Sequence, residues 1–344
     1  MPNAPITTDV AVIGAGPVGL FAVFECGMLN LNCQVIDALD EVGGQLSALY
    51  PEKPIYDIPG HPEILAGELI SMLEAQAAPF SPTYHLGQQV TGMEEKNGRW
   101  LLSTTKSVEI DAGAVIIAAG VGAFGPNRPP LDGIQAFEGM GPGQGVNYLV
   151  KRREDFRDKN VVIAGGGDSA VDWAVSLSEV AKSIKVIHRR PKFRAAPETV
   201  AKMQALADGG NVELVVPFQL ASLDGGANGL TAVTVADLDG NTRTLDADVL
   251  LPFFGLTQNI GPIAEWGLGI DHNHITVDPA TMNAGPAGIF GAGDIITYPG
   301  KLKLILMGFS EAALAAHSAR DHVHPDEAYH FEHSTSAGVP GGAS

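Results

Sequence analysis

The sequence predicts an α/β protein in which two domains repeat one strand–turn–helix–strand unit and the second domain is inserted in the first. The unit first occurs at 10–37, where an apolar run enters a glycine-rich turn and a second apolar run follows. It recurs in the same order at 161–187. Two further apolar runs, 115–118 and 249–254, are expected to be buried strands, and each precedes a segment rich in Gly, Pro and Asn. We interpret these two segments as the linkers that leave and re-enter the first domain.

This arrangement divides the chain into four parts. The first domain comprises 1–121 and 255–324, and the inserted domain comprises 122–254. The last part, 325–344, is a C-terminal extension. The length of 344 residues suits about two domains at ~100–200 residues each.

Composition excludes several classes of protein. With 45% hydrophobic and 17% charged residues, the chain is not a disordered polymer. Its net charge of −18 argues against a general nucleic-acid binder, which needs cationic surface to neutralise phosphates. The longest uncharged apolar stretch, 10–24, is interrupted by glycine and proline and is too short for the ~20 residues of a membrane span. The N-terminus has no basic region of a secretory signal, so we expect a cytoplasmic protein.

The first glycine-rich turn, GAGPVG at 14–19, follows a strand and opens a helix, which is the context a dinucleotide-binding (Rossmann-like) fingerprint requires. Its first glycine permits the tight turn, the second lets the backbone approach a pyrophosphate, and the third lets helix and strand pack closely. An acid ends the second strand, where a carboxylate can accept hydrogen bonds from ribose hydroxyls. The residues predicted for this site are Gly14, Gly16, Pro17, Gly19 and Asp37.

The second turn, GGGDSA at 165–170, carries the variant GxGxxA. The strand after it is followed by His-Arg-Arg-Pro-Lys-Phe-Arg at 188–194, so arginines stand where the first site has an acid. An acid would repel a 2′-phosphate, whereas guanidinium groups bind it with paired hydrogen bonds. The sequence therefore predicts a preference for NADP over NAD. The residues predicted for this site are Gly165, Gly167, Asp168, Ser169, Arg189, Arg190 and Arg194.

A third motif, GAGD at 291–294, follows a short apolar run near the C-terminus. It looks like the second flavin fingerprint of flavoproteins with two dinucleotide folds, in which the acid, here Asp294, binds a hydroxyl of the ribityl chain. One site for NADP(H) and one for FAD indicate hydride transfer between nicotinamide and flavin. The first domain is therefore the FAD-binding domain and the inserted domain the NADPH-binding domain, each expected as a three-layer ββα fold.

The order of the three motifs resembles the thioredoxin reductase family over nearly the whole chain. The catalytic CxxC of that family is missing, and the inserted domain holds no cysteine. Cys26 and Cys33 are expected to fill the core rather than to carry redox chemistry. Other segments are similar to the thioredoxin-reductase-like ferredoxin–NADP reductases. These segments are 43–46, 50–60, 122–126, 298–305 and 333–336.

The resemblance implies roles for single residues in the first domain. Tyr50 would stack on one face of the flavin ring and Gln45 would hydrogen-bond the flavin region. Phe124 would pack near the flavin, and Val90 would meet the adenine through its backbone. No catalytic side chain and no metal ligand is implied, because the cofactors carry the chemistry.

The C-terminal extension holds the remaining implied contacts. In the resembling family it covers the flavin of the other subunit, so His333 would stack on the second face of the ring. Thr335 would place a polar group near the ring. A homodimer is therefore expected, with each extension completing the site of the other subunit.

The electron acceptor is less constrained by the sequence. Ferredoxin is implied by the resemblance, and flavodoxin, a small disulfide or a quinone are the alternatives. A flavin-based redox sensor without turnover is a further alternative. An acidic partner would need a local basic face, for which we consider Lys301, Lys303 and the run 151–159, although a solvated helix is the simpler interpretation of that run.

Overall fold

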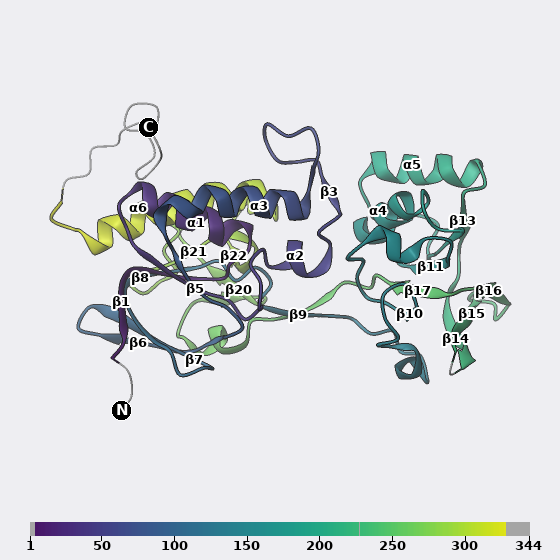
Figure 1. Cartoon of the computed structure of the whole chain (residues 1–344), viewed down its shortest axis with the longest axis horizontal. Helices are drawn as coiled ribbons and strands as arrows, with labels where there is room; N and C mark the ends of the chain where they lie inside the picture. Colours follow the sequence, from purple (N-terminus) through teal and green to yellow (C-terminus); the bar gives the residue numbers. More distant parts are fainter. Residues whose placement is uncertain (1–3, 227, 328–344) are drawn as a thin grey trace. The chain divides into compact units, whose positions relative to one another are not determined.

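The structure is a computed structural model that describes residues 4–226 and 228–327, and it contains two compact units (Figure 1). Unit 1 contains Met1–Phe124 and Gln258–Ser344, and unit 2 contains Gly125–Thr257. The chain thus leaves unit 1, forms unit 2 and returns. The two connections, β9 (Ala123–Pro126) and β18 (Leu256–Asn259), pair with each other as a two-stranded sheet.

Unit 1 is built on a seven-stranded sheet in which β1 (Ile6–Ile13) has a parallel neighbour on each side. It pairs with β2 (Cys33–Ile36) and with β8 (Glu109–Ile117). These strands are nearly continuous apolar runs, as expected for parallel strands covered on both faces. The other strands of the sheet are β5 (Thr83–His85), β6 (Val90–Lys96), β7 (Arg99–Thr104) and β21 (Ile289–Gly291).

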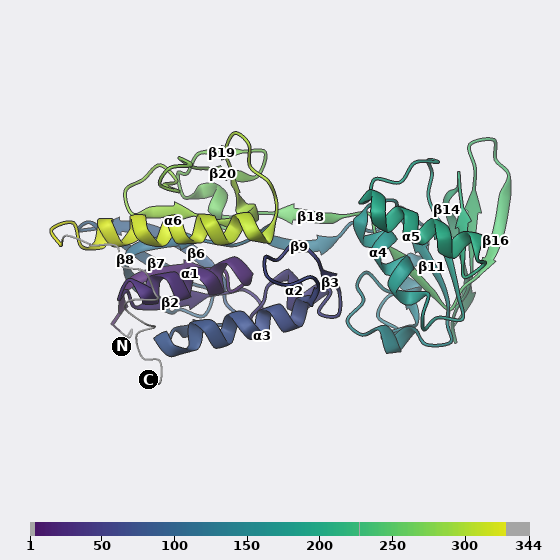
Figure 2. The same ribbon diagram turned by 90° about the horizontal axis from the view of Figure 1, so that it is seen from above.

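Three helices form one layer on this sheet, with α1 (Pro17–Met28) lying between α3 (Ala66–Ala77) and α6 (Ile305–Val323) (Figure 2). Proline suits the start of α1, because its fixed φ fits the first turn and its missing N–H would have no partner there. The buried side of α6 consists mostly of glycine and alanine, so the helix approaches its neighbours closely. The C-terminal ends of β1 and β2, where the first glycine-rich turn lies, are therefore next to the starts of α1 and α6.

Short elements complete unit 1. The helix α2 (Gln45–Leu49) follows β2, and a hairpin-like pair precedes α3. One 3-10 turn, η1, follows α3. The returning segment contains two more 3-10 turns, η4 and η5, and a three-stranded sheet. These elements are β3 (Pro54–Ile55), β4 (Ile64–Leu65), η1 (Ala78–Phe80), η4 (Gly261–Glu265), β19 (Ile270–Asp271), β20 (His274–Thr276), η5 (Gly293–Ile295) and β22 (Ile296–Thr297).

Unit 2 has a five-stranded parallel sheet in the order β10-β17-β11-β12-β13. Helices α4 and α5 lie on one face of the sheet, and an antiparallel three-stranded sheet lies on the other (Figure 1). Val162 and Ala164 of β11 belong to one buried apolar cluster with Val233 of the second sheet, which covers this face. The elements are β10 (Gly145–Val146), β11 (Asn160–Ala164), β12 (Ser183–Ile187), β13 (Val212–Val215), β14 (Gln219–Gly226), β15 (Gly229–Ala236), β16 (Thr242–Asp246), β17 (Val249–Pro252), α4 (Asp168–Leu177), α5 (Pro197–Asp208), η2 (Ile134–Phe137) and η3 (Arg153–Phe156).

The predicted α/β class and the repeated strand–turn–helix–strand unit are both present. The buried strand expected at 249–254 is shorter than predicted, because β17 ends at Pro252 and the side chain of Phe254 is 43% exposed. Phe254 is already part of the chain that leaves the sheet, which the apolar run alone could not indicate. Over the described residues, no helix has the length and apolarity to cross a bilayer.

Candidate functional site

The first glycine-rich turn of unit 1 has the backbone that its three glycines predict. Gly14 has φ +110°, and a side chain there would collide with the carbonyl of Ala118. A side chain at Gly19 would collide with the carbonyl of Gly14, so helix and strand pack tightly at this point. At Gly16, by contrast, an added Cβ would have only the Cα of Gly44 nearby, at 3.9 Å. The second glycine thus leaves open space at the start of α1.

Gly16 is also the N-cap of α1, and no side chain caps this helix. The first N–H groups of a helix have no partner within the helix, and they carry a partial positive charge. Open space and free donors at one helix start form a cradle for an anionic pyrophosphate.

Asp37, directly after β2, is bonded to this turn. One oxygen of its carboxylate accepts the backbone N–H of Ala15 at 2.6 Å, and the other accepts that of Leu39 at 2.8 Å. Burial raises the pKa of Asp37, and the two N–H donors partly oppose the rise. Each oxygen keeps further acceptor capacity, so the carboxylate can also receive ribose hydroxyls.

The segment that contains Val90 lies beside Asp37. The backbone N–H of Gln88 donates to the carbonyl of Asp37 at 3.0 Å, and that of Gly87 to the carbonyl of Leu39 at 2.8 Å. Val90 opens β6 and is 3% exposed, within the core of unit 1. The structure thus brings this segment to the end of β2, where the adenosine half of a dinucleotide would lie.

The segment after Asp37 also returns to the glycine-rich turn. The N–H of Gly43 donates to the carbonyl of Ala15 at 2.8 Å, and Gly44 adopts φ +59° directly opposite Gly16. Gln45 begins α2, and its amide nitrogen would be 3.7 Å from a Cβ added at Gly120. Gln45 therefore lies near the carboxyl end of β8, close to the first motif.

Tyr50, at the end of α2, lies close enough to Asp294 to respond to its charge. The pKa of Tyr50 is raised to about 12, first by burial and then by the negative charge of Asp294. Asp294 lies in η5, directly after β21, and is partly buried. The predicted stacking residue and the predicted ribityl-binding acid, far apart in sequence, thus occupy one region.

The GAGD motif contacts the first motif through α6. Gly293 has φ +81°, and its nearest neighbour is the side chain of Val18 in the first turn of α1. A side chain at Gly308 of α6 would collide with Val18 and would lie 3.4 Å from the Cα of Gly293. The starts of α1 and α6 therefore meet at the GAGD turn, and the flavin-site residues predicted from separate motifs lie together.

A buried ion pair beneath the GAGD turn was not predicted. Glu311 of α6 and Lys301 have side chains that are 2% and 5% exposed, with Nζ–Oε1 and Nζ–Oε2 distances of 2.6 and 2.7 Å. Glu311 also accepts the N–H of Gly293 at 2.8 Å and the hydroxyl of Tyr298 at 2.7 Å. The expectation that Lys301 serves as a docking cation is therefore wrong, because its charge is buried against Glu311. The sequence signal for this ion pair was Glu311 itself, a charged residue on a helix face formed mostly by glycine and alanine, which indicates a buried cationic partner.

The glycine-rich turn of unit 2 resembles the first turn in its open glycine. Gly167 is the N-cap of α4, which no side chain caps, and an added Cβ there would meet nothing within 4 Å. A Cβ at Gly165 would lie 2.7 Å from the carbonyl oxygen of Phe253. Asp168 accepts the N–H of Ala196 at 2.9 Å, which ties the start of α4 to the basic segment. Ser169, in the first turn of α4, is exposed.

The basic segment 188–194 lies against this turn. The N–H of Arg194 donates to the carbonyl of Gly166 at 2.6 Å, and a side chain at Gly166 would collide with the ring of His188. That ring stacks on Phe193 with a centroid distance of 5.1 Å. Burial lowers the pKa of His188, and its buried Nε2 has no hydrogen-bond partner within the described residues. The nitrogen is thus an unsatisfied polar atom beside Gly166, the middle glycine of the turn.

The three arginines predicted for the 2′-phosphate are available to a ligand. Arg189, Arg190 and Arg194 are exposed, and none of them forms an ion pair with a carboxylate in the part of the chain that the structure describes. Free guanidinium groups beside an open helix start suit a phosphorylated ribose. The residues of unit 2 therefore fit NADP(H).

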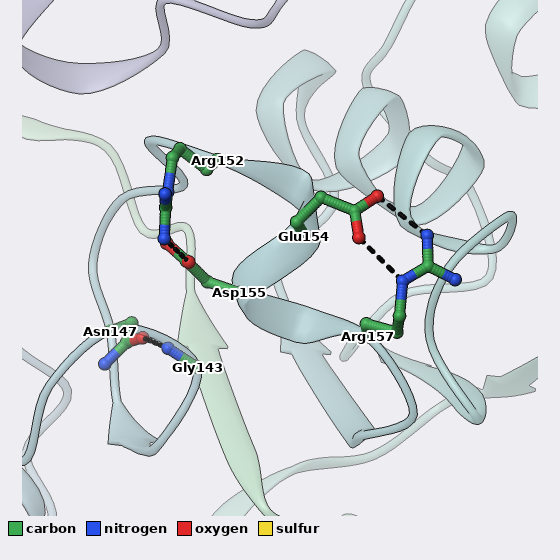
Figure 3. Close-up of polar contacts among 6 residues, drawn as sticks. All are labelled: Gly143, Asn147, Arg152, Glu154, Asp155 and Arg157. Atoms are coloured by element: carbon green, nitrogen blue, oxygen red, sulfur yellow. Dashed lines mark hydrogen bonds and ion pairs between the residues drawn. The ribbon is translucent and has the colours of Figure 1, made fainter.

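The arginines at 152–157 are paired instead (Figure 3). Arg157 forms a two-pronged contact with Glu154 at 2.6 and 2.7 Å, and Arg152 binds Asp155. Arg153 lies 3.1 Å from Glu179. The run 151–159 considered as a basic docking face therefore has most of its positive charge neutralised by neighbouring acids.

Several predicted residues remain untested. Phe124 lies in β9, at the point where the chain leaves unit 1, but the structure does not describe its side chain. His333 and Thr335 lie outside the described residues.

Cys26 and Cys33 are buried free thiols, and the pKa of Cys26 is raised by its contact with Cys33 and by burial. A thiol with a raised pKa is a poor nucleophile, so the raised pKa of Cys26 and the burial of both thiols agree with a core role for this pair.

Comparison with known proteins identifies the fold and the family of this chain. A family described as pyridine nucleotide-disulphide oxidoreductase matches residues 8–319. The structure is similar to that of a thioredoxin reductase from Lactococcus lactis, with a TM-score of 0.78, 22% identity, and coverage of 92% of this chain and 99% of the other. This likeness confirms the predicted fold class.

Two relatives are much closer in sequence. A protein from Paramagnetospirillum magneticum named ferredoxin–NADP reductase is 65% identical over 336 residues, covering 97% of this chain and 98% of the relative. A protein of the same name from Rhodospirillum rubrum is 60% identical over 343 residues, covering 98% of each chain. The resemblance predicted from the motifs is thereby confirmed. The chain belongs to the pyridine nucleotide-disulphide oxidoreductase family, in a group with the bacterial relatives named ferredoxin–NADP reductase.

Proposed function

We propose that this protein is a ferredoxin–NADP reductase that binds FAD in unit 1 and NADP(H) in unit 2. The observation that carries the proposal is the contrast between the two open glycine turns. One is bonded to a carboxylate, Asp37, and the other lies beside three arginines that form no ion pair with a carboxylate among the described residues. FAD, when bound, accepts a hydride from NADPH and passes electrons on singly, which a one-electron acceptor requires.

The residues of unit 1 hold and orient the flavin in this proposal. The start of α1 binds the pyrophosphate, Asp37 the ribose, and Asp294 the ribityl chain. Tyr50 covers one face of the ring, and its raised pKa keeps the phenol protonated at neutral pH. A neutral, partly buried phenol ring can stack without placing a charge next to the flavin.

The acceptor follows from the relatives and from the missing dithiol. The chain is 65% and 60% identical to proteins named ferredoxin–NADP reductase. Its two cysteines are buried in unit 1, so electrons have no thiol route to a disulfide substrate. Free thiols also suit a reducing compartment, and we infer a cytoplasmic location.

The decisive experiment is reduction of cytochrome c by NADPH with and without added ferredoxin. We expect a large ferredoxin-dependent rate and a smaller rate with NADH. A chain that binds no FAD, or one that reduces ferricyanide but not ferredoxin, would contradict the proposal. Equal or faster reduction of flavodoxin would assign flavodoxin as the acceptor.

We further propose a homodimer in which the extension 325–344 covers the flavin of the partner subunit. Exposed apolar side chains on the helix layer favour a covered surface: Met72 of α3 is 48% exposed, and Leu314 of α6 is 41% exposed. From the end of α6 at Val323, the ten residues to His333 can extend by up to ~33 Å.

Truncation after Asp326 tests this part of the proposal. It should leave FAD binding intact, because the nucleotide motifs remain, and it should speed the reaction of the reduced flavin with oxygen. Leu314→Glu should weaken the dimer, as measured by light scattering. A truncated protein with the wild-type flavin spectrum and oxygen reactivity would refute the covering role.

For ferredoxin docking we propose Lys303 rather than the paired arginines. Lys303 lies in the segment that follows GAGD and is exposed, and its Nζ is 2.8 Å from Nε2 of His274 in β20. Lys303→Glu should lower the association rate with acidic ferredoxin without changing ferricyanide reduction. An unchanged ferredoxin rate at low salt would refute this assignment.

A further inference from the structure

We infer that Glu311 is a positioning residue for the flavin site, that it acts through the turn carrying Asp294, and that Lys301 balances its charge. This inference rests on the proposed function, because it takes FAD as the ligand of unit 1. Its central residue, Glu311, lies outside every motif used above.

The burial of this pair is unusual for its surroundings. Glu311 is 2% exposed on a face of α6 that is otherwise formed largely by small apolar residues, and the side chain of Lys301 is 5% exposed. Moving two charges out of water is costly, and two apolar side chains of similar size often serve stability as well. Stability alone therefore gives little reason for an ion pair at this place. The neighbouring small residues are Gly308, Ala312, Ala315, Ala316 and Ala319.

The contacts of Glu311 converge on one turn. Oε2 accepts the N–H of Gly293, the residue before Asp294, at 2.8 Å. Oε1 accepts the hydroxyl of Tyr298 at 2.7 Å, and both oxygens contact Nζ of Lys301 at 2.6 and 2.7 Å. Glu311 therefore holds the chain on both sides of Asp294.

A carboxylate is the side chain suited to this arrangement. It only accepts hydrogen bonds and offers about four acceptor positions on two oxygens, which here serve four contacts from three residues. A glutamine has one accepting oxygen and would present N–H groups to Lys301. Gly293 itself adopts φ +81°, a conformation that other residues rarely adopt. Because glycine is flexible, we expect the hydrogen bond from Glu311 to keep the turn in this conformation.

The two partners are expected to depend on each other. Glu311→Gln leaves the ammonium of Lys301 buried without a counter-charge, and Lys301→Met leaves the carboxylate in the same state. The double variant Glu311→Gln/Lys301→Met removes both charges and keeps one oxygen to accept the N–H of Gly293. It is the conservative rescue of either single variant.

The test compares FAD release from the full-length holoprotein and the flavin reduction potential among these variants. We expect each single variant to bind FAD about tenfold or more weakly than wild type, because one buried charge has lost its partner. The double variant should recover to within about threefold of wild type, since a neutral replacement is tolerated. An exposed ion pair of unit 2 provides the matched control: Glu198→Gln/Lys202→Met on α5 should change neither quantity.

Thermal unfolding of the flavin-free full chain separates positioning from stability. A positioning role lowers FAD affinity and shifts the potential by more than the stability of the flavin-free chain accounts for. The inference is overturned if the single variants keep wild-type affinity and potential, or if their loss of FAD only follows a loss of stability. A double variant no better than the singles overturns the role of Lys301. A wild-type chain without FAD affinity would instead contradict the proposed function.

Discussion

The two glycine-rich turns use the same backbone position in chemically opposite ways. In unit 1 the residue after the second strand is Asp37, and its carboxylate accepts the N–H of Ala15, the middle residue of GAG. In unit 2 the corresponding residue is His188, and its ring lies against Gly166, the middle residue of GGG. One turn is thus bonded to a partly buried carboxylate, and the other packs against an imidazole whose pKa burial lowers.

This difference teaches how one fold distinguishes two nucleotides. In dinucleotide-binding folds the residue after the second strand contacts the ribose, so we expect its charge to influence whether a 2′-phosphate is accepted here. The middle residue of the turn then has to match the size of that neighbour. Alanine fits beside Asp37, whereas only glycine fits beside His188.

The largest expected effect breaks the contrast at its basic side. Arg189→Ala/Arg190→Ala should raise KM for NADPH about 100-fold or more, because each lost charge-assisted contact is worth roughly 1.5–3 kcal/mol. KM for NADH should barely change. The measurement is steady-state reduction of ferricyanide with each nucleotide.

The matched control for this prediction is Arg152→Ala/Arg157→Ala, since those arginines are already paired with acids. It should leave the ratio of the two KM values unchanged. Equal losses with NADPH and NADH in the first variant would mean that Arg189 and Arg190 contact the pyrophosphate instead.

A smaller effect is expected from exchanging the middle residues. Gly166→Ala places a methyl group on the ring of His188 and should lower kcat/KM for NADPH about tenfold, as overpacking typically costs 1–3 kcal/mol. Ala15→Gly in unit 1 removes a methyl group and should change kcat/KM for NADPH little. If Gly166→Ala and Ala15→Gly change kcat/KM for NADPH equally, the size of the middle residue does not determine the position of His188.

At the acidic side, Asp37→Asn should weaken FAD binding about fivefold, because an amide cannot accept from both Ala15 and Leu39. The raised pKa of Asp37 adds a pH dependence. As pH falls through that raised pKa, the wild type should lose affinity for FAD while Asp37→Asn shows no such step. Fluorescence of released FAD between pH 4 and 8 measures both, and parallel pH curves would contradict the assignment.

The smallest effect concerns Tyr50 and appears only in alkali. Its pKa is about 12 in the fold against about 10 when unfolded, so the unfolded state loses its proton first as pH rises. The stability from Tyr50 is complete below pH 10 and falls between pH 10 and 12. Between pH 8 and 11 the free energy of unfolding should therefore fall by about 1 kcal/mol less in Tyr50→Phe than in the wild type. Urea unfolding at the two pH values measures this, and identical losses would show that Tyr50 is not shielded.

The sequence alone could predict the parts of the site that local patterns encode. Glycine-rich turns such as 14–19 can be identified from the sequence, because position 14, with φ +110° and packed against Ala118, accepts only glycine. The acid and the arginines after the second strands follow from the order of the elements. These are short-range relations, and the structure agrees with them.

Contacts between distant segments could not be predicted in the same way. Lys301 seemed a free surface cation, but its partner Glu311 lies on the next helix, and only packing brings the two together. Arg152 and Arg157 seemed a basic run until their pairing with Asp155 and Glu154 was visible. Charge along a sequence does not reveal which charges cancel in space.

The paired connections β9 and β18 have a consequence for the history and engineering of this chain. The N–H of Asn127 donates to the carbonyl of Gly255 at 3.0 Å, so the two ends of unit 2 are held together like the base of a hairpin. A segment whose ends meet can be exchanged, excised or circularly permuted as a cassette with little added loop-closure entropy. A foreign nucleotide-binding domain whose ends also meet is therefore expected to be accepted at the same point without strain on unit 1.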